Sequence, residues 1–377
     1  MNHRLTRLAA AGALVAGVAL SATAAASSAG ADVSPTHAVF ALTDATSNSV
    51  LSFARASDGS LSAFGSFSTG GVGLSAAGAA ADPLASQGGL TLAGGGRVLL
   101  AVNSGSDTVS VFGVDGASLT LLGQVGSDGN FPVSIASHGN LVAVLNAGGA
   151  GSVAEFTLNG TTLSPLAGEV RSLGLSNSSP PYFLAGAGQV GYSPDGRFLV
   201  ATTKASSSSF EVFAVHGDGT LSTDATVTSA AHAVPFAFTW GASDQLVAVE
   251  ASTSSLSVYS LDSTGALTLT GTVSDGAAAL CWVSAARGYY FGDNAGSHTV
   301  SSFSVSPGGV PTLDQATAGT AYAGTTDSAA SPDGHYLYVE SGGSGKLSVF
   351  SVSADGSLTW DQTISGLPVP YEGIAVS

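Results

Sequence analysis

The chain has 377 residues and a lopsided charge, with 25 acidic against 9 basic residues and a formal net charge of −16. A protein with so few cations is a poor partner for nucleic acid or for anionic membrane surfaces, which excludes both classes of function. The single cysteine, Cys281, has no intramolecular disulfide partner, and its apolar neighbours predict a buried thiol. The stability of the fold must therefore come from packing.

The amino terminus has the pattern of a secretory signal peptide. Two arginines within the first seven residues precede an apolar run that ends near Ala26. We expect cleavage between positions 24 and 31, which assigns residues 1–31 to the signal peptide and leaves 32–377 as a single secreted domain without membrane contact. An uncleaved membrane anchor is the alternative, although the run is barely long enough to span a bilayer.

Seven copies of one pattern follow at a period of about 45 residues, the range expected for propeller blades. Each copy has an apolar strand that ends in a polar residue, then a short loop, then a strand that ends in an aromatic residue. Asn103 with Phe112 and Glu250 with Tyr259 are the clearest examples. The aromatic residues of the other copies are Phe53, Phe156, Phe213, Phe303 and Phe350.

Turn sequences mark the limits of each copy. Asp-Gly pairs at 58–59, 218–219 and 355–356 follow the aromatic strand and supply the positive φ that tight hairpins need. A further short strand and a Ser-Pro-Asp-Gly turn precede the apolar strand, as at 193–196 and 331–334. Each copy therefore predicts four strands, which is one blade of a β-propeller.

The two ends of the chain predict how the ring closes. The first copy begins at His37 without an innermost strand, and residues 370–377 have the pattern of that missing strand. We expect an all-β, monomeric, seven-bladed β-propeller of four-stranded blades, closed by the C-terminal strand pairing in the first blade. An open β-solenoid and a two-sheet sandwich are the alternatives, but neither gives a reason to split one repeat between the termini.

Residues 192–200 and 103–112, together with the repeated Asp-Gly-Ser-Leu turns, resemble the lactonase family of β-propellers. That family includes 6-phosphogluconolactonases and carboxymuconate-lactonizing enzymes, and the resemblance covers residues 37–377. It implies a carboxylic ester hydrolase that opens a small lactone. The motifs are specific for the fold and weak for the activity, because function does not follow from fold.

The polar residue that ends each second strand belongs to a ring around one face of the propeller, which we call the mouth. The ring contains Asp44, Asn103, Asn146, Lys204, Glu250, Asn294 and Glu340. Asparagine and aspartate at such places are also typical of turns, because their side chains bond to the nearby backbone. Lys204, Glu250 and Glu340 do not fit that explanation, so they predict a face that binds something polar.

The resemblance implies that Glu250 is the catalytic base, and His232 or Lys204 would assist it. Other positions depart from the family, because Ala187 and Phe236 stand where a histidine and an arginine would be expected. No spacing typical of a zinc site or of a nucleotide-binding loop is present, so we expect no metal and no cofactor.

Two hypotheses of different class follow. The first is a lactonase-like hydrolase of a neutral extracellular lactone, because the scarcity of cations disfavours the anionic substrates of the family. The second is a non-catalytic extracellular propeller that binds a glycan, a peptide or a cell-surface partner through its loops. A pocket that joins Glu250, Lys204 and His232 would favour the hydrolase, whereas a flat or plugged mouth would favour the binder.

Overall fold

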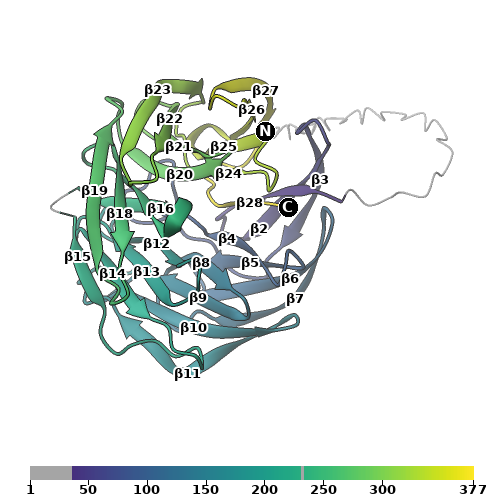
Figure 1. Cartoon of the computed structure of the whole chain (residues 1–377). Coiled ribbons are helices and arrows are strands. Elements are labelled where there is room, and N and C mark those ends of the chain that lie inside the picture. Colours follow the sequence, from purple (N-terminus) through teal and green to yellow (C-terminus); the bar gives the residue numbers. More distant parts are fainter. Residues whose placement is uncertain (1–35, 231–232) are drawn as a thin grey trace, which may run out of the picture. The chain divides into compact units, whose positions relative to one another are not determined.

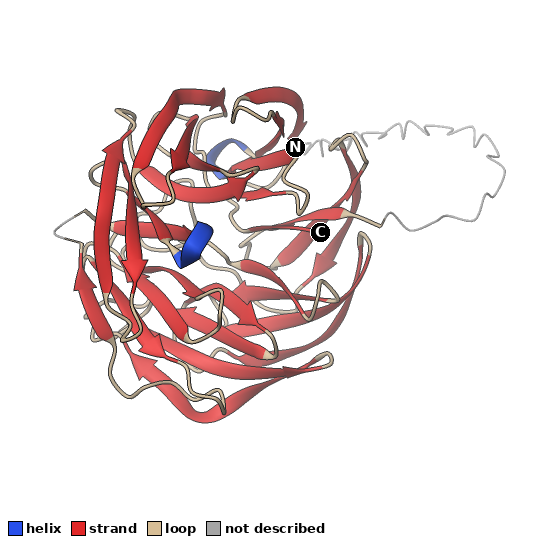
Figure 2. Cartoon of the chain, viewed as in Figure 1, coloured by secondary structure: helices blue, strands red, loops and turns tan. Residues whose placement is uncertain are grey.

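The computed structural model describes residues 36–230 and 233–377. Within these residues, 28 strands form seven antiparallel sheets of four strands each, and the two short helices are single 3₁₀ turns, η1 (Ala242–Asp244) and η2 (Gly342–Ser344) (Figures 1 and 2). The expected seven-bladed fold is confirmed. The predicted signal peptide and His232 lie outside the described residues.

Each sheet is one blade, in which the first strand named lies innermost and the fourth outermost. Blade 1 contains β28 (Ile374–Val376), β1 (Ala38–Leu42), β2 (Ser49–Arg55) and β3 (Leu61–Ser68). Blade 2 contains β4 (Leu90–Ala93), β5 (Val98–Asn103), β6 (Thr108–Asp115) and β7 (Ser118–Gly126). Blade 3 contains β8 (Pro132–His138), β9 (Leu141–Asn146), β10 (Ser152–Asn159) and β11 (Thr162–Ser172).

The other four blades repeat this order along the chain. Blade 4 contains β12 (Ala187–Tyr192), β13 (Phe198–Thr203), β14 (Ser209–Ala214) and β15 (Thr226–Ser229). Blade 5 contains β16 (Pro235–Trp240), β17 (Leu246–Glu250), β18 (Ser255–Leu261) and β19 (Leu267–Ser274). Blade 6 contains β20 (Leu280–Ala286), β21 (Tyr289–Asn294), β22 (Thr299–Val305) and β23 (Pro311–Thr320). Blade 7 contains β24 (Ser328–Ala330), β25 (Tyr336–Ser341), β26 (Lys346–Val352) and β27 (Leu358–Ser365).

The aromatic residue of each copy lies in the third strand of its blade and is buried between blades. In every blade except blade 4, the register between the third and outermost strands shifts at this residue. Such bulges increase the local twist of a strand pair. The repeated aromatic residue therefore marks both the packing between blades and the place where the outer strands begin to twist.

The C-terminal strand closes the ring as predicted. β28 pairs with β1 through Val39 with Val376, Phe40 with Ala375 and Ala41 with Ile374. The innermost strands also contact one another in sequence around the centre, from β28 through β4, β8, β12, β16, β20 and β24 back to β28. The first and last blades therefore leave no open edge between them.

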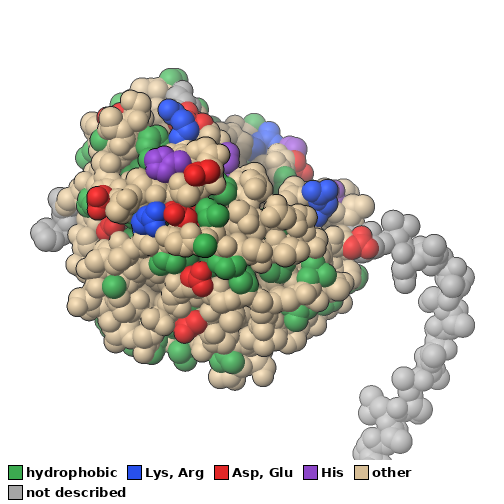
Figure 3. All heavy atoms as spheres, turned by 90° about the horizontal axis from the view of Figure 1, so that it is seen from below, with side chains coloured by type: hydrophobic (Ala, Val, Ile, Leu, Met, Phe, Trp, Pro, Cys, Tyr) green, Lys and Arg blue, Asp and Glu red, His purple; other side chains and the backbone are tan. Residues whose placement is uncertain are grey.

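The surface of the propeller carries few charges. On the face drawn in Figure 3, acidic, basic and hydrophobic side chains are scattered among other side chains and backbone. This agrees with a charged fraction of only 9% of all residues. Among the described residues, no helix is long and apolar enough to cross a membrane.

Candidate functional site

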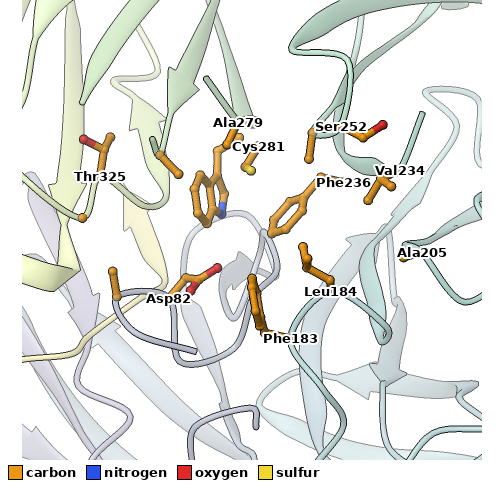
Figure 4. A pocket seen from close by; sticks show the side chains of 15 residues that line it. Asp82, Phe183, Leu184, Ala205, Val234, Phe236, Ser252, Ala279, Cys281 and Thr325 are labelled. Carbon is orange, nitrogen blue, oxygen red and sulfur yellow. The ribbon is translucent and has the colours of Figure 1, made fainter. Parts of the chain in front are cut away.

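A pocket of about 390 Å³ lies on the mouth face, between loops that follow second strands and loops that lead into innermost strands. Its wall is mostly apolar, and Figure 4 shows side chains converging on it from several blades. The lining residues are Ala81, Asp82, Phe183, Leu184, Ala205, Val234, Phe236, Ala251, Ser252, Ala279, Cys281, Trp282, Ala295, Gly324 and Thr325.

Aromatic side chains form part of the pocket wall. Phe236 and Trp282 meet edge to face, with ring centroids 5.0 Å apart, and Phe183 lines the pocket as well. Phe236 stands where the resemblance led us to expect an arginine or a histidine. Because a phenyl ring replaces a polar side chain at this place, the pocket is suited to an apolar ligand group.

Residues 82–86, which we call the floor segment, begin at Asp82 in the lining of the pocket. The buried Glu372 accepts hydrogen bonds from the backbone N–H groups of Leu84, Ala85 and Ser86 at 2.8, 3.0 and 3.1 Å. The indole N–H of Trp282 donates to the Ser86 carbonyl at 2.6 Å. The floor segment is therefore held by Trp282 of blade 6 and by Glu372 of the segment that leads into β28 of blade 1.

Lys204 also holds the floor segment. Its ammonium donates to the Ala85 carbonyl at 2.5 Å and lies 5.0 Å from the centre of the Phe236 ring. Burial lowers the pKa of Lys204 to about 8, although the negative charges of Asp82 and Glu372 oppose that shift. Lys204 is almost fully buried and does not line the pocket.

Asp82 is the one acidic side chain among the described residues that line the pocket. Burial raises the pKa of its carboxyl, and the charge of Lys204 acts in the opposite direction. Its neighbour Cys281 is a poor nucleophile, because burial raises the pKa of the thiol and keeps it protonated. Asp82 is thus the group in this pocket that is best suited to exchange a proton.

A second hollow, of about 550 Å³, lies along the central channel, between the innermost strands of the blades. Gln87 lines it and joins blade 6 through two hydrogen bonds with the backbone of Val283, at 2.9 and 3.0 Å. Asp82 lines the mouth pocket and Gln87 lines the channel, so the floor segment runs from the lining of one hollow to the lining of the other.

The seven predicted ring positions are all buried. Three of them act as braces, because the amides of Asn103 and Asn294 donate to serine hydroxyls on the next strand, and the amide of Asn146 donates to the Ser127 carbonyl. None of the seven lines the mouth pocket. The ring therefore lies behind the pocket wall, and its proposed role in binding stays a prediction.

Glu250 does not line the mouth pocket. Its carboxylate accepts a hydrogen bond from the Tyr259 hydroxyl at 2.8 Å within blade 5, and burial raises its pKa. Lys204 and Glu250 do not meet in one pocket, although the residues that follow them, Ala205 and Ala251, both line it. The catalytic role that the resemblance implied for Glu250 stays a prediction.

Asp44 and Glu340 hold the turn that carries Glu372, the residue that binds the floor segment. The Asp44 carboxylate accepts from the Glu372 N–H at 3.0 Å, and Glu340 accepts from the Gly373 N–H at 2.9 Å. Burial raises the pKa of both carboxyls well above the usual range. These two ring residues position the turn before β28 and thereby the carboxyl of Glu372. Among the described residues, no cluster of three or more His, Cys, Asp or Glu is arranged to hold a metal ion.

Comparison with known proteins agrees with this architecture. The family model described as lactonase, 7-bladed β-propeller, matches residues 158–284, which run from blade 3 into blade 6. The resemblance to the lactonase family is confirmed. The matched part of this lactonase-like propeller includes Phe236, Trp282 and both charged ring residues of blades 4 and 5. A search of curated protein sequences finds no significant match to the chain.

Solved structures show the same fold at low identity. A periplasmic gluconolactonase of Pseudomonas aeruginosa is 18% identical, with a TM-score of 0.69 over 90% of this chain and 98% of that one. A protein from Lactobacillus plantarum is also 18% identical, with a TM-score of 0.71 over 91% of this chain and 99% of the other. Likeness at this level establishes the lactonase-like fold and leaves the substrate open.

Proposed function

We propose that this protein is a secreted hydrolase of neutral, mainly apolar lactones, which bind in the mouth pocket. The lining of that pocket carries the proposal, because its wall consists mostly of Ala, Val, Leu and aromatic side chains, with Asp82 as the acidic group. The family match supports lactone chemistry. The gluconolactonase among the similar structures supports it at the level of the fold.

The charges around the pocket argue against anionic lactones. Lys204, whose ammonium lies beside the Phe236 ring of the pocket wall, is buried and bonded to the Ala85 carbonyl, so it presents no ammonium group to a phosphate or a carboxylate. Asp82 and the neighbouring Glu372 would repel such a ligand if charged. Burial of the apolar surface of a neutral ligand against the hydrophobic wall instead makes the free energy of binding more favourable.

Binding without turnover is the second candidate function. It is favoured by the position of Glu250, because the base that the resemblance implied is buried, accepts a hydrogen bond from Tyr259 and does not line the pocket. Such a propeller would hold an apolar small molecule through the same wall.

The test compares purified residues 32–377 on a panel of neutral alkyl-substituted lactones and of phosphorylated sugar lactones. We expect turnover of neutral lactones at least about tenfold above that of anionic ones, a difference of about 1.4 kcal/mol. Saturable quenching of tryptophan fluorescence by a neutral lactone without hydrolysis would select the binding function, because Trp282 lines the pocket. Faster opening of the phosphorylated lactones would contradict the proposal.

A further inference from the structure

Asp82 is placed to act on a molecule in the mouth pocket. Figure 4 shows its side chain at the base of the pocket, beside Phe183. Leu84, Ala85 and Ser86, which follow it, are fixed by Glu372, and the Ala85 N–H donates to the carbonyl of Asp82 at 3.1 Å. A base on such an anchored turn keeps its orientation, which proton transfer to a bound substrate requires.

We propose that Asp82 is the general base for lactone hydrolysis in this pocket, and that Lys204 is a positioning residue that favours the ionised carboxylate. This inference rests on the proposed function. The Asp82 carboxylate takes a proton from a water molecule while the water oxygen forms a bond to the lactone carbonyl carbon and the π electron pair of the C=O bond moves to the carbonyl oxygen. The C=O bond then re-forms as the ring C–O bond breaks, the proton passes from Asp82 to the departing ring oxygen, and the product is the hydroxy acid.

The surroundings of Asp82 suit this role. The titratable groups that act on it are Lys204, Glu372 and Cys281. Burial raises the pKa of Asp82 and so makes its carboxylate a stronger base than an exposed one, while Lys204 favours the ionised form. The Cys281 thiol stays neutral, because burial raises its pKa.

Lys204 does not line the pocket and acts on it only through Ala85 and Asp82. Its ammonium bonds the Ala85 carbonyl, three residues beyond Asp82, and so it fixes the floor segment and supplies a positive charge at once. An arginine at this place would keep the charge, whereas a methionine would keep much of the apolar chain and remove the charge. The two substitutions therefore separate electrostatics from packing.

The experiment uses the neutral lactone that the wild-type protein opens fastest. For Asp82→Asn we expect kcat to fall about 100-fold or more, with lactone binding by tryptophan fluorescence changed less than about threefold. Asp361→Asn, an exposed aspartate on β27, is the matched control and should keep the wild-type rate. A kcat of Asp82→Asn within about twofold of wild type would overturn the inference. So would a loss of kcat of about 100-fold in Glu250→Gln while Asp82→Asn keeps its rate.

A pH profile keeps the test decisive even if Asp82→Asn folds poorly. In Lys204→Met, we expect the acidic limb of kcat/KM to move to higher pH, because removing the positive charge raises the pKa of Asp82, and Lys204→Arg should restore it. An unmoved limb would overturn the role of Lys204. Absence of any lactone turnover by the wild-type protein would overturn the proposed function itself. Wild-type turnover that does not depend on Asp82 would overturn only the role of Asp82, so the two failures are distinguishable.

Discussion

At the scale of single residues, the site depends on side chains that the repeat pattern does not mark. Asp82 and its neighbours come from residues 69–89, a stretch rich in Gly, Ala and Ser in which Asp82 is the only charged residue. That isolation is the signal by which sequence reasoning could have selected Asp82. Glu372 meets Leu84 across 288 positions of the chain, and no local pattern predicts such a contact.

Glu372 offers a prediction at this scale. Replacing it with alanine leaves the backbone N–H groups of Leu84 and Ser86 without an acceptor, while the Ala85 N–H keeps its bond to the Asp82 carbonyl. Each buried unsatisfied donor costs about 1–3 kcal/mol. We expect Glu372→Ala to lower the free energy of unfolding by about 3 kcal/mol or more. Urea denaturation measures this loss.

Glu372→Gln is the matched control. Its amide oxygen can still accept from Leu84 and Ala85, so it should lose less than half as much stability as the alanine variant. Equal losses in the two variants would show that the acceptor oxygen does not hold the floor segment.

At the scale of strands and blades, sequence and structure agree closely. The repeat of about 45 residues, the Asp-Gly turns and the aromatic residues predicted every blade. They could do so because each blade has the same order of strands and turns and packs against its neighbours through the same positions. The sequence identified the ring positions but did not predict that they are buried, because a polar residue at a strand end can face either solvent or a neighbouring loop. The structure assigns Asn103 and Asn294 to bracing serines on the next strand.

Ring closure gives the prediction for this scale. Ile374 in β28 is only 5% exposed and pairs with Ala41, so Ile374→Ala should cost about 2–5 kcal/mol of unfolding free energy through lost burial and a cavity. Val369 lies just before β28 and is 60% exposed, and Val369→Ala should change stability by less than about 0.5 kcal/mol. Thermal unfolding of both variants is the measurement. Similar melting temperatures would mean that β28 does not stabilise the closed ring.

At the scale of the whole molecule, buried carboxyl groups should set the pH dependence of stability. Burial raises the pKa of Glu155, Glu211 and Asp327 to about 7. The folded state therefore holds these protons more tightly than the unfolded state does. Their contribution to stability is fully present below the ordinary values near 4 and is lost as the pH rises through about 7.

Turn aspartates act in the opposite direction at lower pH. Hydrogen bonds from neighbouring hydroxyls lower the pKa of Asp58, Asp218 and Asp355, so the stability that they add is lost as the pH falls through their folded values, below 3.8. We expect the melting temperature to be highest near about pH 4 and to fall from there toward pH 8. A melting temperature that increases steadily from pH 5 to pH 8 would contradict this ordering.

The central claim is that the mouth pocket holds the lactone, and filling that pocket tests it most directly. Ala251 lines the pocket, so Ala251→Phe should occupy the space of the ligand. Ala316→Phe adds the same side chain on the exposed strand β23. We predict that Ala251→Phe lowers kcat/KM for the best neutral lactone at least about tenfold, while Ala316→Phe leaves it unchanged. Wild-type kcat/KM in a folded Ala251→Phe protein would contradict the claim.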